Sequence, residues 1–172
     1  MKQLAAKSSL FTIKPYIPGK PIEEVKRELG LREVIKLASN ENPYEISPKV
    51  RKAIEAAIPS LNRYPDGDCF YLRKELSRIL GVDSKQLIFG NGSDEIIVFA
   101  ARAFLKNGDE VIVAQPSFLI YDIASKLEGA HVVAVPIKDF KYDLRGMKKA
   151  INSKTRIIFL GNPDNPAGSY FS

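Results

Sequence analysis

The sequence predicts an α/β fold with three layers, in which a mainly parallel sheet lies between helices. Short apolar runs at 110–114, 131–136 and 155–160 alternate with amphipathic segments of helical spacing. Runs of this length and type indicate strands buried on both faces, as in a parallel sheet covered by helices. A further apolar run at 87–89 ends in a glycine turn and is expected to be another strand.

The segments between these runs predict helices at 94–105, 118–127 and 143–151. Earlier in the chain, proline at the start and glycine or proline at the end of amphipathic stretches predict further helices. They are expected at 21–29, at 48–58 and around Leu72–Leu80. Residues 1–20 contain several prolines and are expected to form an irregular arm.

The composition is that of a soluble globular protein: 172 residues, 45% hydrophobic and 27% charged. The formal charge of +6 does not indicate nucleic-acid binding, because basic residues alternate with acids and form no cluster with stacking aromatics. The single cysteine excludes an internal disulfide and is typical of a reducing compartment. No apolar run is long enough for a signal peptide or a membrane span, so a cytoplasmic location is expected. With one histidine, His131, in an apolar run, no metal site is expected.

A glycine turn at Gly90 and Gly92 precedes the helix expected at 94–105. Glycine permits positive φ and close approach of a ligand. Ser93 or Asp94 can begin the helix, and the first N–H groups of a helix, at the positive end of its dipole, attract anions. The turn is therefore a candidate phosphate site, the alternative being an ordinary strand-to-helix turn. No third small residue and no Gly-Lys-Ser/Thr follow, which excludes a dinucleotide fingerprint and a P-loop.

A second unusual segment is Asn-Pro-Asp-Asn-Pro-Ala-Gly at 162–168, directly after the last expected strand. Two prolines restrict the backbone on either side of Asp164 and Asn165, so Asn165 is presented at a fixed angle. Ligands collect at the carboxyl ends of the strands in sheets of this kind. Together with the glycine turn, this segment predicts a ligand with an anionic end and a polar ring.

Five motifs occur in the order typical of the pyridoxal-phosphate aminotransferases of fold type I. They are Asn-Glu-Asn-Pro at 40–43, Arg-Tyr-Pro-Asp-Gly at 63–67, Gly-Asn-Gly-Ser-Asp-Glu at 90–95, Pro-Ser-Phe at 116–118, and the segment 162–168. Over nearly its whole length the chain resembles the N-terminal half of these enzymes, and within them it is most similar to the histidinol-phosphate aminotransferases.

The resemblance implies an N-terminal arm and part of a small domain in residues 1–60, and the first part of an incomplete large domain in residues 61–172. It also implies a seven-stranded sheet in which strands 110–114 and 131–136 pair directly. In that order, strand 155–160 is separated from them by a strand that comes later in the chain.

For the cofactor phosphate, the resemblance implies backbone contacts from Gly92, Ser93 and Asp94. It also implies a contact from the hydroxyl of Tyr64, donated by the other subunit of a homodimer. The alternative for Tyr64 is a packed loop aromatic.

For the cofactor ring, the resemblance implies that Phe118 stacks on the pyridine and that Asn165 bonds its 3′-oxygen. Tyr16 and Asn40 match positions on the substrate side. The alternative for Phe118 is a core position. Many relatives have tyrosine there, and phenylalanine stacks without the hydroxyl.

The chain also departs from the family pattern. The family segment usually reads Asn-Pro-Asn-Asn-Pro-Thr-Gly, so Asp164 and Ala167 are exchanges. The Schiff-base lysine of the family is expected beyond Ser172, so no catalytic residue is assigned within this chain. The chain by itself is expected to be inactive.

The function that the resemblance implies is transamination of L-histidinol phosphate with 2-oxoglutarate in histidine biosynthesis, with pyridoxal 5′-phosphate as cofactor. Two alternatives within the class are another pyridoxal-phosphate aminotransferase and an enzyme like threonine-phosphate decarboxylase. An alternative from a different class is an inactive fragment that binds a phosphate ligand.

Overall fold

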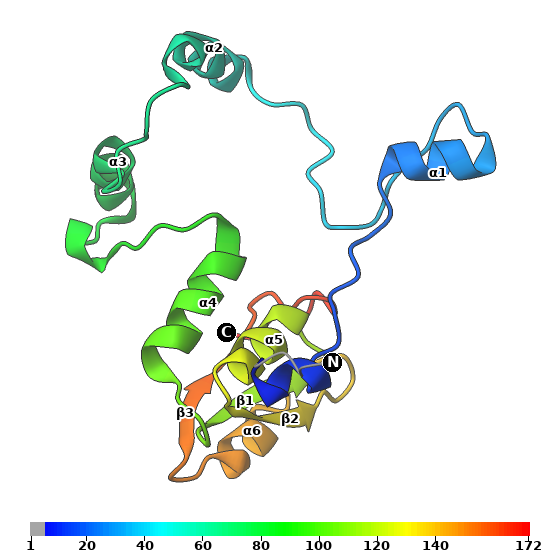
Figure 1. Cartoon of the computed structure of the whole chain (residues 1–172), viewed down its shortest axis with the longest axis vertical. Helices are drawn as coiled ribbons and strands as arrows, with labels where there is room; N and C mark the ends of the chain where they lie inside the picture. Colours follow the sequence, from blue (N-terminus) through cyan, green and yellow to red (C-terminus); the bar gives the residue numbers. More distant parts are fainter. Residues whose placement is uncertain (1–5) are drawn as a thin grey trace. The chain divides into compact units, whose positions relative to one another are not determined.

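The computed structural model describes residues 6–172 (Figure 1). Contacts divide the chain into two compact units. One is Ile17–Leu87, and the other joins the residues up to Tyr16 to Ile88–Ser172. The part of the predicted arm at residues 1–5 lies outside the described residues.

The unit Ile17–Leu87 contains three α-helices: α1 (Ile22–Leu29), α2 (Pro48–Ala57) and α3 (Phe70–Leu80). Two 3-10 turns, η2 (Ile58–Ser60) and η3 (Ser84–Gln86), accompany them. Helix α2 begins as its sequence predicts, with proline in the first turn and the hydroxyl of Ser47 accepting from the Val50 N–H. Helices α1 and α3 both end at a glycine in the left-handed conformation. The three predicted helices are confirmed, and none of them has a buried residue.

The second unit is built on a parallel sheet of three strands in the order β2-β1-β3. The strands are β1 (Glu110–Gln115), β2 (His131–Pro136) and β3 (Thr155–Ile158). Strand β1 is central, and its Val111 and Ile112 are fully buried. The apolar runs therefore form a buried parallel sheet, as predicted.

Helices cover both faces of this sheet (Figure 1). Alternate residues of a strand point to opposite faces. Val111 and Val113 pack in one cluster with α4 (Gly92–Phe104) and α5 (Leu119–Leu127). Helix α6 (Leu144–Ala150) contacts β1 and β2 without sharing that cluster, and its Met147 is buried. The 3-10 turn η1 (Ser8–Thr12), which the sequence did not predict, packs on α5.

The predicted separation of strand 155–160 from strand 110–114 is wrong. Strand β3 pairs directly with β1, with Ile112 opposite Ile158. The pairing continues past the strand end, where the Phe159 N–H donates to the carbonyl of Ile112 at 3.0 Å. The helix α6 crossover returns the chain to the free edge of β1, so the most buried strand is paired on both sides.

The strand predicted at 87–89 does not form, since these residues belong to none of the three strands of the described part of the chain. Leu87 has extended backbone angles, yet the segment runs without a ladder into the glycine turn. Extended conformation alone does not make a strand, since a strand is defined by its hydrogen-bonded neighbour. Helix α4 begins at Gly92, two residues before its predicted start.

Asp143, the residue that caps the start of α6, is expected to make the stability of the fold depend on pH. The Asp143 carboxylate accepts from the Gly146 N–H at 2.9 Å and pairs with Lys138 at 2.5 Å. The Lys138 ammonium, and after it the Gly146 N–H, lower the pKa of Asp143 below its ordinary 3.8. A carboxylate with a lowered pKa stabilises the fold above its unfolded value, and that stability is lost as pH falls through the folded value.

We therefore expect stability to fall as the pH drops below about 3.8, and Asp143→Asn to lack this part of the fall. Asparagine retains a capping oxygen but carries no charge. Thermal unfolding of the two forms between pH 5 and pH 2 measures the difference. Asp139→Asn, at an exposed aspartate in the same loop, is the control. Parallel curves for Asp143→Asn and the unchanged protein would contradict the assignment.

Candidate functional site

The candidate site lies at the carboxyl ends of the strands, where three segments begin. Residues 116–118 follow β1, residues 159–168 follow β3, and α4 starts on the side toward which β3 points (Figure 1). This is the edge of a parallel sheet at which ligands collect.

The glycine turn before α4 has two specific glycine positions. Gly92 has φ +80°, a conformation that other residues rarely adopt. At Gly90 a Cβ would approach the side chain of Ile96 to 2.9 Å, too close without a shift. The backbone conformation therefore requires glycine at 92, whereas a side chain at 90 would need the end of the Ile96 side chain to shift.

The turn is exposed, and some of its donors are already paired. The Asn91 N–H donates to the carboxylate of Glu95 at 2.7 Å, and the Gly92 N–H donates to the Gly90 carbonyl at 2.9 Å. Helix geometry leaves the N–H groups of Ser93 and Asp94 without intrahelical acceptors. An acid thus already occupies part of the helix start, and only the next two N–H groups remain for a ligand.

The segment 162–168 is closed by hydrogen bonds of its own residues. The side chain of Asn162 pairs with the backbone of Phe171 in both directions, at 2.9 and 3.1 Å. The Asp164 N–H donates to the Ser169 carbonyl at 2.8 Å, and the Gly168 N–H donates to the Asp164 carbonyl at 2.9 Å. Asp164 is buried, whereas the adjacent Asn165 is exposed. The backbone thus holds one polar side chain inward and presents the next one outward.

The buried Asp164 carboxylate accepts from two donors. Its Oδ1 accepts from the Tyr142 hydroxyl at 2.6 Å, and its Oδ2 accepts from the Ala167 N–H at 3.0 Å. The Tyr142 oxygen in turn accepts from the Gly161 N–H at 3.2 Å. The two departures from the family segment, Asp164 and Ala167, are therefore in contact with each other.

Burial, and secondly the hydrogen bond to Asp164, raise the pKa of Tyr142. Burial and the charge of Asp164 also raise the pKa of Tyr121. The buried hydroxyl of Ser117 has no hydrogen bond of good geometry within the described residues, but it lies close enough to Tyr142 to offset part of that rise in pKa. Both phenols are therefore neutral hydrogen-bonding groups near pH 7.

Three aromatic rings connect the segments that follow β1 and β3. Phe118 meets Tyr121 edge to face with ring centroids 5.7 Å apart, and Tyr121 stacks on Phe159 at 4.5 Å. Such pairs stabilise packing beyond the area they bury. Phe118 itself is only partly buried, because it lines a cavity of about 390 Å³ with Ser117 and Leu119.

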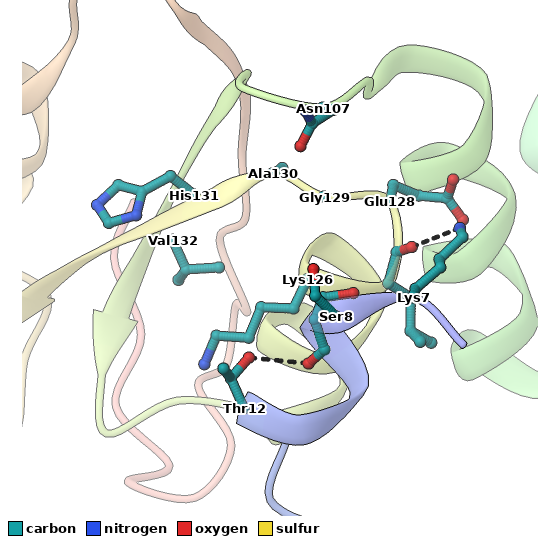
Figure 2. A pocket seen from close by; sticks show the side chains of 12 residues that line it. Lys7, Ser8, Thr12, Asn107, Lys126, Glu128, Gly129, Ala130, His131 and Val132 are labelled. Atoms are coloured by element: carbon teal, nitrogen blue, oxygen red, sulfur yellow. Dashed lines mark hydrogen bonds between the residues drawn. The ribbon is translucent and has the colours of Figure 1, made fainter. Parts of the chain in front are cut away.

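A larger cavity of about 780 Å³ lies at the opposite edge of the sheet (Figure 2). It lies between η1 and the start of β2, where the ammonium of Lys7 donates to the Leu127 carbonyl at 2.7 Å. His131, the first residue of β2, lines it and is a strand residue as predicted. None of the predicted site residues lines this cavity, and it is not at the carboxyl edge.

The structure brings Phe118 and the Asn165 segment to one edge of the same unit. Convergence of these two residues with Ser93 on a single cavity stays a prediction. Tyr16 is half exposed, and Asn40 and Tyr64 belong to the other unit, where both are exposed. The contact of Tyr64 with the cofactor phosphate of the other subunit stays a prediction.

Sequence reasoning missed Tyr142 and Tyr121. Tyr142 lies 22 residues before its partner Asp164, so no spacing rule connects the two. The charge on Asp164, between two prolines, was the one available indication that a buried donor must lie nearby.

Residues 32–172 match the family described as aminotransferase class I and II. The chain belongs to this family. It is 47% identical, over 95% of its length, to the histidinol-phosphate aminotransferase of Moorella thermoacetica, and 50% identical, over 92%, to that of Caldicellulosiruptor saccharolyticus. It spans 42% and 44% of the length of these two relatives, less than half of each.

Solved aminotransferases confirm the predicted fold. The Sinorhizobium meliloti histidinol-phosphate aminotransferase, solved in complex with pyridoxal-5′-phosphate, has a TM-score of 0.85 at 24% identity. The match covers 99% of this chain and 46% of that one. A protein from Erwinia carotovora, described as a putative histidinol-phosphate aminotransferase, has a TM-score of 0.72 at 27% identity. That match covers 77% of this chain and 39% of the Erwinia chain.

No helix in residues 6–172 has the length and apolar character that crossing a bilayer requires. The same residues contain no group of three or more histidine, cysteine or acidic side chains placed to hold a metal ion.

Proposed function

We propose that this chain is the N-terminal part of a histidinol-phosphate aminotransferase, which moves an amino group between L-histidinol phosphate and 2-oxoglutarate in histidine biosynthesis. One observation carries the proposal. Eight curated relatives that are 43–50% identical over 90–98% of this chain all have that name. The family membership supports the cofactor, pyridoxal 5′-phosphate.

The residues of the carboxyl edge fit this cofactor. The free N–H groups of Ser93 and Asp94, with Gly92 bare of a side chain, would hold the phosphate at the positive end of α4. Phe118, which is partly exposed, would cover one face of the ring, and the exposed amide of Asn165 would bond the 3′-oxygen. When bound, the cofactor supplies the electron sink of the reaction. The residues of this chain bind and orient it.

Other parts of the proposal concern the complete protein. The Schiff-base lysine is proposed to lie beyond Ser172, and Tyr64 to contact the phosphate of the other subunit in a homodimer. Tyr16 and Asn40 are proposed to face the substrate. Residues 1–60 are proposed as arm and part of the small domain, residues 61–172 as the first part of the large domain, and the location as cytoplasmic.

The test is a substrate comparison on the complete enzyme loaded with pyridoxal phosphate. We expect 2-oxoglutarate-dependent turnover of L-histidinol phosphate, an amino alcohol phosphate, with a far higher kcat/KM than for amino acids. Release of carbon dioxide from threonine phosphate would favour the decarboxylase instead. Pyridoxal phosphate binding without turnover of any amine would favour a binding protein.

The chain 1–172 expressed alone is predicted to self-associate and to lack transaminase activity. Apolar side chains of α2 and α3, such as Ile54 and Ile79, are more than half exposed. The outer edges of β2 and β3 have no partner strand within the described residues, and such edges pair with other chains. Light scattering after size exclusion tests the association. A monodisperse monomer, or measurable turnover, would contradict the prediction.

A further inference from the structure

The buried contacts around Asp164 connect three segments that are separate in the sequence. Tyr142 precedes α6, Gly161 follows β3, and Ala167 lies at the end of the segment 162–168. The Tyr142 hydroxyl donates to Asp164 at 2.6 Å and accepts from the Gly161 N–H at 3.2 Å. The other carboxylate oxygen accepts from the Ala167 N–H at 3.0 Å.

These bonds leave the segment little freedom. A carboxylate accepts both donors, one on each oxygen, and both bonds are charge-assisted, whereas in an amide one of the two atoms is a donor nitrogen and the charge is lost. A second contact from the same region fastens the far end, because the hydroxyl of Ser169 donates to the carbonyl of Phe140 at 2.5 Å. Asn165, one residue from the buried carboxylate, is exposed and has no hydrogen bond within the described residues.

We propose that Tyr142 and Asp164 are positioning residues that hold the segment 162–168 in the conformation in which the Asn165 amide meets the cofactor ring. The proposal rests on the proposed function for the role of Asn165. The hydrogen bonds that join Tyr142, Asp164, Gly161 and Ala167, called the clamp below, are contacts within this chain and do not depend on that function. Neither Tyr142 nor Asp164 touches the reacting atoms; both act through Asn165.

Close packing supports the same conclusion. A Cβ on Gly161 would lie 3.3 Å from the Tyr142 hydroxyl and 3.5 Å from that of Tyr121, so both phenols reach the backbone of this segment. Tyr121 also stacks on Phe159 and meets Phe118 edge to face. The segment that presents Asn165 and the ring of Phe118 are therefore anchored to one packed cluster.

The first test measures the hydrogen bonds of Tyr142 and Asp164 in the complete protein, without cofactor. Tyr142→Phe removes one hydroxyl and keeps the ring. We expect hydrogen exchange at the Ala167 and Gly168 amides to rise about fivefold, as the net loss of one hydrogen bond implies. Asp164→Asn is the second variant and is expected to act in the same direction. Tyr170→Phe, at an exposed tyrosine of the same region, is the control and is expected to leave this exchange unchanged.

The second test uses the complete protein loaded with pyridoxal phosphate. Tyr142→Phe is expected to weaken cofactor binding and to shift the absorption maximum of the bound cofactor in the same direction as Asn165→Ala. In the Asn165→Ala background, Tyr142→Phe is expected to add no further loss, because the two act through one contact.

The outcomes separate the two proposals. Unchanged exchange in both clamp variants, or additive losses of cofactor affinity, would overturn the positioning role. Faster exchange in a protein that binds no pyridoxal phosphate would overturn the proposed function and leave the clamp standing.

Discussion

Replacing Asn165 with alanine is expected to weaken pyridoxal phosphate binding to the complete enzyme by about 10- to 150-fold. The reason is the loss of a hydrogen bond to a charged oxygen, which contributes roughly 1.5–3 kcal/mol. The Asn165 side chain is exposed, and backbone hydrogen bonds of its neighbours hold the segment. Removing the side chain is therefore not expected to disturb the fold. The absorption maximum of the bound cofactor is expected to shift as well.

Spectroscopic titration of the apoenzyme with cofactor measures both effects. Asn152→Ala is not a suitable control, because its amide bonds Glu110 at 2.7 Å. Asn107→Ala is better matched: Asn107 lies at the opposite edge of the sheet, on the wall of the larger cavity (Figure 2). Equal affinity and an equal spectrum for Asn165→Ala and the unchanged protein would refute the role of Asn165.

Replacing Ile112 with alanine is expected to lower the free energy of unfolding by about 2–5 kcal/mol, the range for truncating a fully buried isoleucine. Ile112 is 0% exposed and lies in the central strand, opposite Val133 on one side and Ile158 on the other. Both neighbouring strands fix its surroundings, so the cavity left by the substitution has little room to collapse.

Urea unfolding of the complete protein at a fixed cofactor concentration measures this loss, since bound cofactor itself adds stability. Ile151→Ala removes the same atoms from a position that is 49% exposed, and it is expected to cost clearly less. A loss below about 1 kcal/mol for Ile112→Ala would mean that β1 is not the centre of the core.

Much of the fold was predictable because its elements are strongly patterned. Strands β1 and β2 have bounds within one residue of their apolar runs, and helix α5 within one residue of its amphipathic segment. The run at 87–89 is equally apolar, yet it forms no strand. Apolar character indicates that a segment can be buried, but it does not show whether the segment joins a hydrogen-bonded ladder.

In the candidate site, the restricted backbone segments were predictable, but the side-chain contacts were not. Gly90, Gly92 and the segment 162–168 stand out locally, because glycine and proline restrict the backbone wherever they occur. The engagement of the Asn91 N–H by Glu95 was not foreseen, although the acid lies within the motif itself. Which of several donors a side chain takes depends on the rotamer that packing selects.

By itself, the sequence determined the alternation of strands and helices, the glycine turn and the restricted segment around Asn165. These are properties of residues close together in the chain. Only the tertiary structure decided that β3 pairs with β1 and that Tyr142 reaches Asp164. Both depend on the order β2-β1-β3, which brings the end of β3 and the loop before α6 to one edge. The physical reason is that such contacts are fixed by the path of the backbone through space, and local patterns carry no record of that path.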